Sequence, residues 1–232
     1  YGFGSWLECN RMVGSGSAWS TSDGQQMLWD AERTPVTMIA YAPFMSEATP
    51  DASLTVNALT NQSTEENVKS SDFLLMKATV DPEQDLTADG KLKISLNHAM
   101  SKLIIKITVN GTTDASMSKL GDMAINGAVV NATCDLSAAA PVVVPAADAV
   151  VATVAPYKGT ESCECILPPQ KIAEGFSVNF SYDGKLYIWT AKEAIELEEG
   201  VEHTLTLNVN TTVRLAAKMA RNWATGQLID RN

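Results

Sequence analysis

The sequence predicts an all-β protein built from antiparallel sheets, with few or no helices. Two stretches carry this prediction. Apolar and polar residues alternate with the period of a strand over much of residues 91–110, and a two-residue turn signal divides residues 176–191 into matching halves. Other short apolar segments recur between turn-forming residues at a spacing typical of β-sandwiches.

Residues 91–110 are expected to form two strands joined by a bend. Every second residue of the segment 91–97 is apolar, and the alternation returns in residues 103–109 with the opposite phase. Because a shift by one residue turns every side chain to the other face, a bulge or bend is required near residues 98–101. The apolar residues of the two parts are Leu92, Ile94 and Leu96, and then Leu103, Ile105, Ile107 and Val109.

Three tryptophans, Trp6, Trp19 and Trp29, stand among turn-forming residues near the start of the sequence. The sequence SDG at residues 22–24 predicts a hairpin turn that would bring Trp19 and Trp29 together across a ribbon. Such rings could stack against carbohydrate. Packing of the rings within the protein is the interpretation that we favour.

The next part of the chain is expected to contain two strands and one short helix. Residues 36–42 form a strand ended by Pro43, and residues 72–80 form another. The polar residues between them are mostly loop, but Ser63 followed by Glu66 is a capping-box pattern that predicts a helix near residues 64–70.

A domain boundary is expected after residue 110, because residues 111–119 are small and polar. The predicted domains are residues 1–110 and 111–232, each a β-sandwich. In the second half, Asp183-Gly184 signals a type I′ hairpin turn. The predicted cross-strand pairs are Tyr182 with Lys185, Phe180 with Tyr187, Val178 with Trp189, and Phe176 with Ala191.

The last long segment keeps one apolar phase over about twice the usual length of a strand. We expect it to break near residues 208–212 or to extend as an exposed edge strand. Its apolar residues are Leu205, Leu207, Val209, Val213, Leu215, Ala217, Met219 and Trp223.

Charge and chemistry exclude several functions. The net charge of −10 leaves no basic footprint for nucleic acid, and no apolar run approaches the ~20 residues of a membrane helix. The two histidines, His98 and His203, have no acid or nucleophile placed beside them by local pattern. We expect no catalytic residues, no cofactor and no metal site. The cysteines (Cys9, Cys134, Cys163 and Cys165) lack zinc spacing and are expected to be small buried hydrophobes, with a disulfide involving Cys134 as the alternative.

Several motifs taken together, in their order and spacing, resemble the fimbrillin family of Bacteroidales. They are LWDAERTPVTMIAYAPF (28–44), SDFLLMKA (71–78), KLKISLNHAMSKLIIKI (91–107), CILPPQ (165–170), FSVNFSYDGKLYIWT (176–190), EGVEHTLTLNV (199–209) and NWATG (222–226). The HAMSKL element at residues 98–103 and the LPPQ turn at residues 167–170 are the most specific.

This resemblance implies two tandem transthyretin-like β-sandwich domains and a lipoprotein precursor exported to the outer membrane. It implies a structural or adhesive subunit of a surface fimbria, not an enzyme, which assembles by β-strand exchange once proteolysis removes an N-terminal strand. A start at Tyr1 fits a first domain that lacks its first strand. The partners are then other fimbrial subunits, with a host or bacterial surface protein or glycan as an adhesion target. Our candidate donor or groove strand contains Val213, Leu215, Ala217, Met219 and Trp223.

Two other readings remain open. The chain could be a non-polymerising surface lipoprotein that binds glycan or protein through Trp6, Trp19 and Trp29, or a hydrolase on a β-sandwich scaffold.

Overall fold

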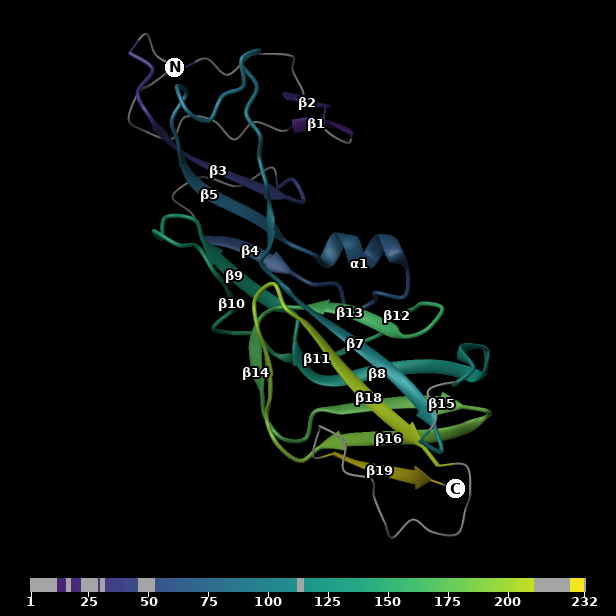
Figure 1. Cartoon of the computed structure of the whole chain (residues 1–232). Helices are drawn as coiled ribbons and strands as arrows, with labels where there is room; N and C mark the ends of the chain where they lie inside the picture. The colour runs from purple at the N-terminus through teal and green to yellow at the C-terminus, as the bar shows by residue number, and fades with distance from the viewer. Residues whose placement is uncertain are drawn as a thin grey trace.

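The computed structural model describes residues 12–15, 18–21, 29, 32–45, 53–111, 115–210 and 226–231. It is an elongated all-β structure with one α-helix in this part, and β1 and β19 lie at opposite ends (Figure 1). The strands are β1 (Met12–Ser15), β2 (Ala18–Thr21), β3 (Val36–Ala42), β4 (Ser53–Asn57), β5 (Leu74–Val80), β6 (Asn97–His98), β7 (Ser101–Val109), β8 (Leu120–Val129), β9 (Asn131–Asp135), β10 (Val143–Pro145), β11 (Val151–Val154), β12 (Tyr157–Lys158), β13 (Cys163–Leu167), β14 (Gln170–Ile172), β15 (Ser177–Tyr182), β16 (Lys185–Ala191), β17 (Ile195–Leu197), β18 (Glu202–Val209) and β19 (Gly226–Arg231).

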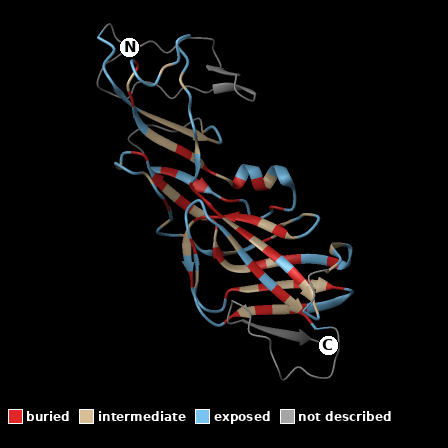
Figure 2. Ribbon diagram, in the orientation of Figure 1, coloured by how far each residue is buried: buried red, intermediate tan, exposed pale blue. Residues whose placement is uncertain are grey.

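The C-terminal part of the molecule is a two-sheet sandwich. One sheet has the order β11-β8-β15-β16-β19 and the other has the order β12-β13-β7-β18. Ile105 of β7 and Ile125 of β8 are both fully buried, and so is Val178 of β15. Figure 2 shows buried residues along strands of both sheets, while most loop residues are exposed. The predicted all-β sandwich class is therefore confirmed.

Most of the remaining strands lie toward the end of the molecule that holds β1 and β2. β10, β9 and β4 form one sheet, β3, β5 and β6 form another, and β1 pairs with β2 (Figure 1). A further two-stranded sheet joins β14 to β17. Strands β3 and β5 lie where the sequence predicted them.

Strands on both sides of the expected 110/111 boundary are hydrogen-bonded to one another. β7, which ends at Val109, pairs with both β13 and β18, and β4 pairs with β9. One buried core cluster extends from Leu54 to Val209. The sheets are thus assembled from strands that are distant in the chain. The division into domains 1–110 and 111–232 stays a prediction, as does the tandem transthyretin-like arrangement.

Of the two strands expected within residues 91–110, the second is present and the first is not. Leu103, Ile105 and Ile107 of β7 are buried, and the chain bends at residues 99–100 as predicted. Residues 91–96, however, form no strand: Leu92 makes one isolated bridge to Leu86, and Ile94 is 40% exposed. An alternating pattern is not sufficient for a strand when no neighbouring strand accepts its hydrogen bonds.

One pairing departs from the antiparallel prediction. β18 runs parallel to β7, with Glu202 opposite Lys102 and Val209 opposite Val109. Alternation along a single strand is the same for both directions of pairing, so the sequence pattern could not reveal it. A parallel pair also needs a long crossover, and here most of the second half of the chain separates the two strands.

The predicted hairpin is confirmed in register and in turn geometry. Tyr182 pairs with Lys185, Phe180 with Tyr187, and Val178 with Trp189, and the Ala191 N–H donates to the Phe176 carbonyl at 2.8 Å. Asp183 and Gly184 have φ values of 52° and 77°, which the type I′ turn requires.

The single α-helix, α1 (Glu65–Ser71), also lies where it was expected. Its cap is Thr64, whose hydroxyl accepts from the Asn67 N–H at 3.2 Å, and not Ser63. Lys69 and Glu65 form an exposed i,i+4 pair at 2.6 Å.

Candidate functional site

The HAMSKL element at residues 98–103 lies where several parts of the fold meet. The Ala99 N–H donates to the carbonyl of Phe73, just before β5, at 2.9 Å. The buried Ser101 hydroxyl donates to the carbonyl of Glu198, which lies in the turn before β18. The Gly200 N–H donates to the Met100 carbonyl at 2.9 Å. The element therefore connects the start of β5 with the turn that precedes β18.

Charged residues surround this junction. His98 Nδ1 lies 2.7 Å from Asp72 Oδ2, and Lys102 Nζ lies 2.9 Å from Glu164 Oε2 and 3.3 Å from Glu202 Oε1. The hydrogen bond with Glu164 raises the pKa of Lys102. The pairs link the C-cap of α1 to β6, and β13 and β18 to β7, on the two sides of the bend.

An open depression of about 330 Å³ lies between α1 and the four-stranded sheet, beside these pairs. Its charged groups pair with one another, and it holds no nucleophile next to a base. It is lined by Glu65, Val68, Lys69, Asp72, His98, Met100, Lys102, Glu164, Ile166, Gly200, Val201 and Glu202. Nothing in its geometry points to a reaction.

Two glutamine side chains form the pair of main-chain hydrogen bonds that a neighbouring strand would otherwise form. The Gln62 amide accepts from the Ile166 N–H at 2.8 Å and donates to the Ile166 carbonyl at 2.8 Å. The Gln170 amide likewise accepts from the Val129 N–H and donates to the Val129 carbonyl, both at 2.9 Å. Gln170 ends the LPPQ turn, so this motif residue has a structural role.

The sequence analysis missed Gln62 altogether. Its partner Ile166 is 104 residues away in the chain, and no local pattern distinguishes a buried glutamine from a polar loop residue.

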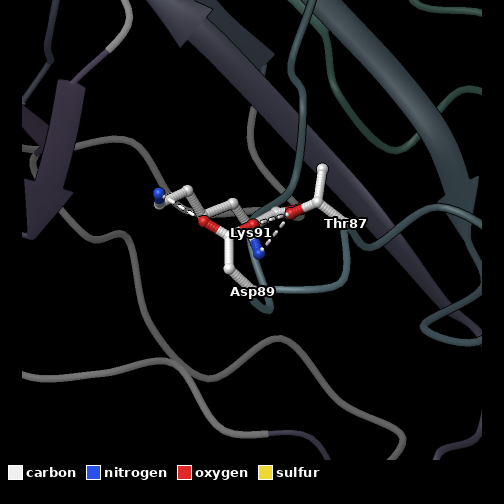
Figure 3. Close-up of polar contacts among 3 residues, drawn as sticks. All are labelled: Thr87, Asp89 and Lys91. Carbon is white, nitrogen blue, oxygen red and sulfur yellow. Dashed lines mark hydrogen bonds and ion pairs between the residues drawn. The ribbon is translucent and has the colours of Figure 1, made fainter.

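In the acidic loop between β5 and β6, polar side chains bond to one another. The Thr87 hydroxyl donates to Asp89 Oδ1 at 2.6 Å, and Lys91 Nζ lies 2.5 Å from Asp89 Oδ2 (Figure 3). Hydrogen bonds from Lys91 and Thr87 lower the pKa of Asp89 to about 2. Within the described ranges, no group of three or more His, Cys, Asp or Glu side chains is arranged to hold a metal ion.

Cys134, Cys163 and Cys165 are buried free thiols. Burial raises the pKa of Cys134 and of Cys163 to about 11, and it raises the pKa of Cys165 further. The interpretation of these three as small hydrophobes is confirmed, and the alternative of a disulfide at Cys134 is not formed. Cys9 lies outside the described residues.

We expect Cys134, Cys163 and Cys165 to resist alkylation in the native protein at mildly alkaline pH and to react fully in urea, because the thiolate is the nucleophile. Iodoacetamide labelling followed by peptide mass spectrometry measures this site by site. Native labelling of Cys163 or Cys165 would contradict the buried position of β13.

The edges of the sandwich are the surfaces on which another strand could add. At one edge of the five-stranded sheet, β19 pairs with β16 along six residues, from Gly226 opposite Ala191 to Arg231 opposite Leu186. At one edge of the four-stranded sheet, β18 pairs with β7 alone among the described strands. The buried side chains Leu205, Leu207 and Val209 confirm the predicted face of β18.

The candidate site residues are only partly within the described chain. Val213, Leu215, Ala217, Met219 and Trp223 lie outside it, as does Trp6. Trp19 lies in β2 opposite Gly14, so the expected cross-strand pair of Trp19 and Trp29 is not formed by strand pairing. Trp29 is half-buried and donates its indole N–H to the Thr34 carbonyl at 2.7 Å. Donor and adhesive roles stay predictions.

A family model described as fimbrillin-like matches residues 8–222. The chain belongs to this fimbrillin-like family. Among proteins with curated functions, none matches the chain. The family match covers the HAMSKL junction and all strands of the sandwich except β19, and it confirms the family to which the sequence motifs pointed.

Solved structures show the same fold at low sequence identity. This fimbrillin-like chain is similar to a candidate cell adhesion protein of Bacteroides uniformis, with 17% identity and a TM-score of 0.64 over 91% of this chain and 79% of that one. A candidate cell adhesion protein of Bacteroides ovatus gives 18% identity and a TM-score of 0.57 over 95% and 73%. A fimbrial protein of the same species gives 16% identity and a TM-score of 0.51 over 86% and 40%.

None of the helices in the described ranges is long and apolar enough to span a membrane.

Proposed function

We propose that this fimbrillin-like chain is a structural or adhesive subunit of a bacterial cell-surface fimbria and has no catalytic role. The observation that carries the proposal is the family match over residues 8–222. The structure supports it because the charged side chains around the HAMSKL junction are paired with one another.

We propose further that subunits assemble by β-strand exchange. In this chain β19 already adds to the edge of β16 through six consecutive residue pairs, so a strand from the C-terminal end can complement a sheet by main-chain pairing. Exchange would replace such pairing within one subunit by pairing between two. The donor side chains would be Val213, Leu215, Ala217, Met219 and Trp223, whose alternation places them on one face of an extended strand.

The subunit would then reside at the cell surface, reached through an outer-membrane lipoprotein precursor. Its partners would be other fimbrial subunits, and a host or bacterial surface protein or glycan would be the adhesion target. These assignments rest on the family and on no site geometry.

Limited proteolysis of the full-length precursor with an Arg- or Lys-specific protease tests strand exchange. We expect SDS-resistant ladders on gels, because exchanged strands make a full set of main-chain hydrogen bonds with the next subunit. Deleting residues 213–232 should remove the ladders.

A pair of double variants makes the test sharper than the deletion. Leu215→Asp with Met219→Asp places charges on the proposed donor face and should abolish the ladders. Thr212→Asp with Asn222→Asp adds the same charge on the opposite face and should leave them intact. Ladders that persist in the first variant would move the donor elsewhere, and no ladder from the processed wild type would refute polymerisation.

If no ladder forms, binding of a glycan or protein by a non-polymerising surface lipoprotein becomes the favoured function. Saturable quenching of tryptophan fluorescence by a glycan, lost in Trp19→Ala, would support it.

A further inference from the structure

One edge of the four-stranded sheet is open along the whole of β18. At the two ends of this strand, the Val201 carbonyl accepts from the Lys102 N–H at 3.0 Å and the Val209 carbonyl accepts from the Asn110 N–H at 2.9 Å. The register between β18 and β7 does not shift between these two points. Because successive residues of a strand turn their main-chain groups to opposite edges, the odd-numbered residues of β18 face β7 and the even-numbered residues face outward.

The outward edge of β18 has the main-chain groups and the side chains that an added strand requires. In the part of the chain that the structure describes, no strand pairs with this edge. Leu205, Leu207 and Val209 belong to the buried core, whereas Thr204 and Thr206 are exposed. A strand that continues the sheet must therefore alternate apolar and polar side chains in the same way. The outward-facing N–H and C=O groups are those of Glu202, Thr204, Thr206 and Asn208.

The other edges of the sandwich are less suited to a new strand. β12 covers only two residues of β13, and further along β13 the Gln62 amide occupies both main-chain groups of Ile166. The register of β11 shifts between Ala152 and Thr153, and a bulge at an edge disfavours further pairing. β19 directly follows the proposed donor residues, so exchange of these residues would displace it. The edge of β18 is the one that remains.

Charge complementarity identifies the strand that this edge would receive. Residues 211–225, which contain the proposed donor side chains, carry three basic residues and no acidic residue, in a chain with a net charge of −10. The basic residues are Arg214, Lys218 and Arg221. Glu198 and Glu199 lie in the turn that leads into β18, and Glu202 begins the strand. A second copy of this chain thus offers both the alternation and the charge that suit the edge.

We propose that the outward edge of β18 is the acceptor for the donor segment (residues 211–225) of a second copy of this chain. This acceptor role rests on the strand exchange proposed above and adds the surface that receives the strand. The even-numbered residues of β18 would pair with the donor segment through their main-chain groups. Leu205, Leu207 and Val209 would lie beside its apolar side chains.

A proline at an outward-facing position tests the main-chain pairing directly. Thr206→Pro removes an N–H that does not bond to β7, so the fold should be retained while strand addition is blocked. Thr206→Ala is the matched control, because it removes the same hydroxyl and keeps the N–H. We expect a fluorescent peptide of residues 211–225 to bind the full chain saturably, as measured by anisotropy. Thr206→Pro should weaken this binding at least about tenfold, and Thr206→Ala should change it by less than about twofold.

Charge variants at the same position test the edge without a proline. Thr206→Lys should weaken binding of the basic peptide, and Thr206→Glu should strengthen it. Added salt should weaken binding to the wild type, because it screens these charges. A peptide of the same composition, with its order changed so that the alternation is lost, should bind at least about tenfold less tightly than the native peptide.

Three results would each overturn the acceptor role of β18. They are a wild type that does not bind the peptide, equal binding by Thr206→Pro and Thr206→Ala, and equal binding of the rearranged peptide. Thermal midpoints of the two variants that agree would show that the proline has left the fold intact.

The outcome can be separated from that of strand exchange, because peptide binding needs neither proteolysis nor ladders. Peptide binding that Thr206→Pro removes, without ladders from the processed wild type, would support the acceptor edge and reject polymerisation. Ladders that persist in processed Thr206→Pro would support strand exchange and reject β18 as the acceptor.

Discussion

Replacing Gln62 by Met is expected to lower the free energy of unfolding by about 3–5 kcal/mol. Gln62 is fully buried, and its amide satisfies both main-chain groups of Ile166 and donates to the Leu59 carbonyl at 2.9 Å. Methionine has a similar length but offers none of these hydrogen bonds. The N–H and carbonyl of Ile166 would then be buried without partners, and each such group costs about 1–3 kcal/mol.

Urea denaturation followed by tryptophan fluorescence measures this effect. Gln84→Met is the control, because Gln84 is exposed and its amide donates to the exposed Asp81 carboxylate. We expect the control to change the free energy of unfolding by less than about 0.5 kcal/mol. A Gln62 effect as small as that of the control would mean that water or another group can replace the amide at Ile166.

Phe180→Ala is expected to cost about 3–5 kcal/mol, the usual range for removing a buried aromatic ring. Phe180 is 2% exposed in the central strand β15, and its ring stacks on Tyr187 with centroids 5.4 Å apart. The substitution removes this contact and leaves a cavity between the two sheets, which packed neighbours fill only in part.

The thermal midpoint and the urea midpoint should both fall for Phe180→Ala. Leu186→Ala, in the same hairpin but 65% exposed, should change the free energy of unfolding by less than about 0.5 kcal/mol. If Phe180→Ala cost less than about 1 kcal/mol, the ring would have to be on the surface, and the register of the hairpin would be wrong.

Of the two residues, the position of Phe180 could be predicted from the sequence and that of Gln62 could not. The position of Phe180 follows from local chemistry: Asp183 and Gly184 adopt positive φ values, the two-residue turn sets the register, and the register places Phe180 opposite Tyr187. The position of Gln62 depends on Ile166, which lies 104 residues away in the chain and is near it only in the folded structure.

Part of the candidate site could likewise be predicted from the sequence. The motifs identified the fimbrillin-like family, and the alternation identified the buried face of β18. The proposed donor residues 213–223 lie outside the described chain, so their role stays a prediction.

The sequence by itself determined the elements whose interactions are local: the hairpin at Asp183-Gly184, the helix after Thr64 and the bend that reverses the phase before β7. Only the tertiary structure decided which strands pair across long separations, including the parallel contact of β7 with β18 and the pairing of β4 with β9. The reason is physical. Turn and cap geometry is set by neighbouring residues, whereas a strand is completed by whichever distant edge satisfies its hydrogen bonds, as the loss of the expected strand at residues 91–96 demonstrates.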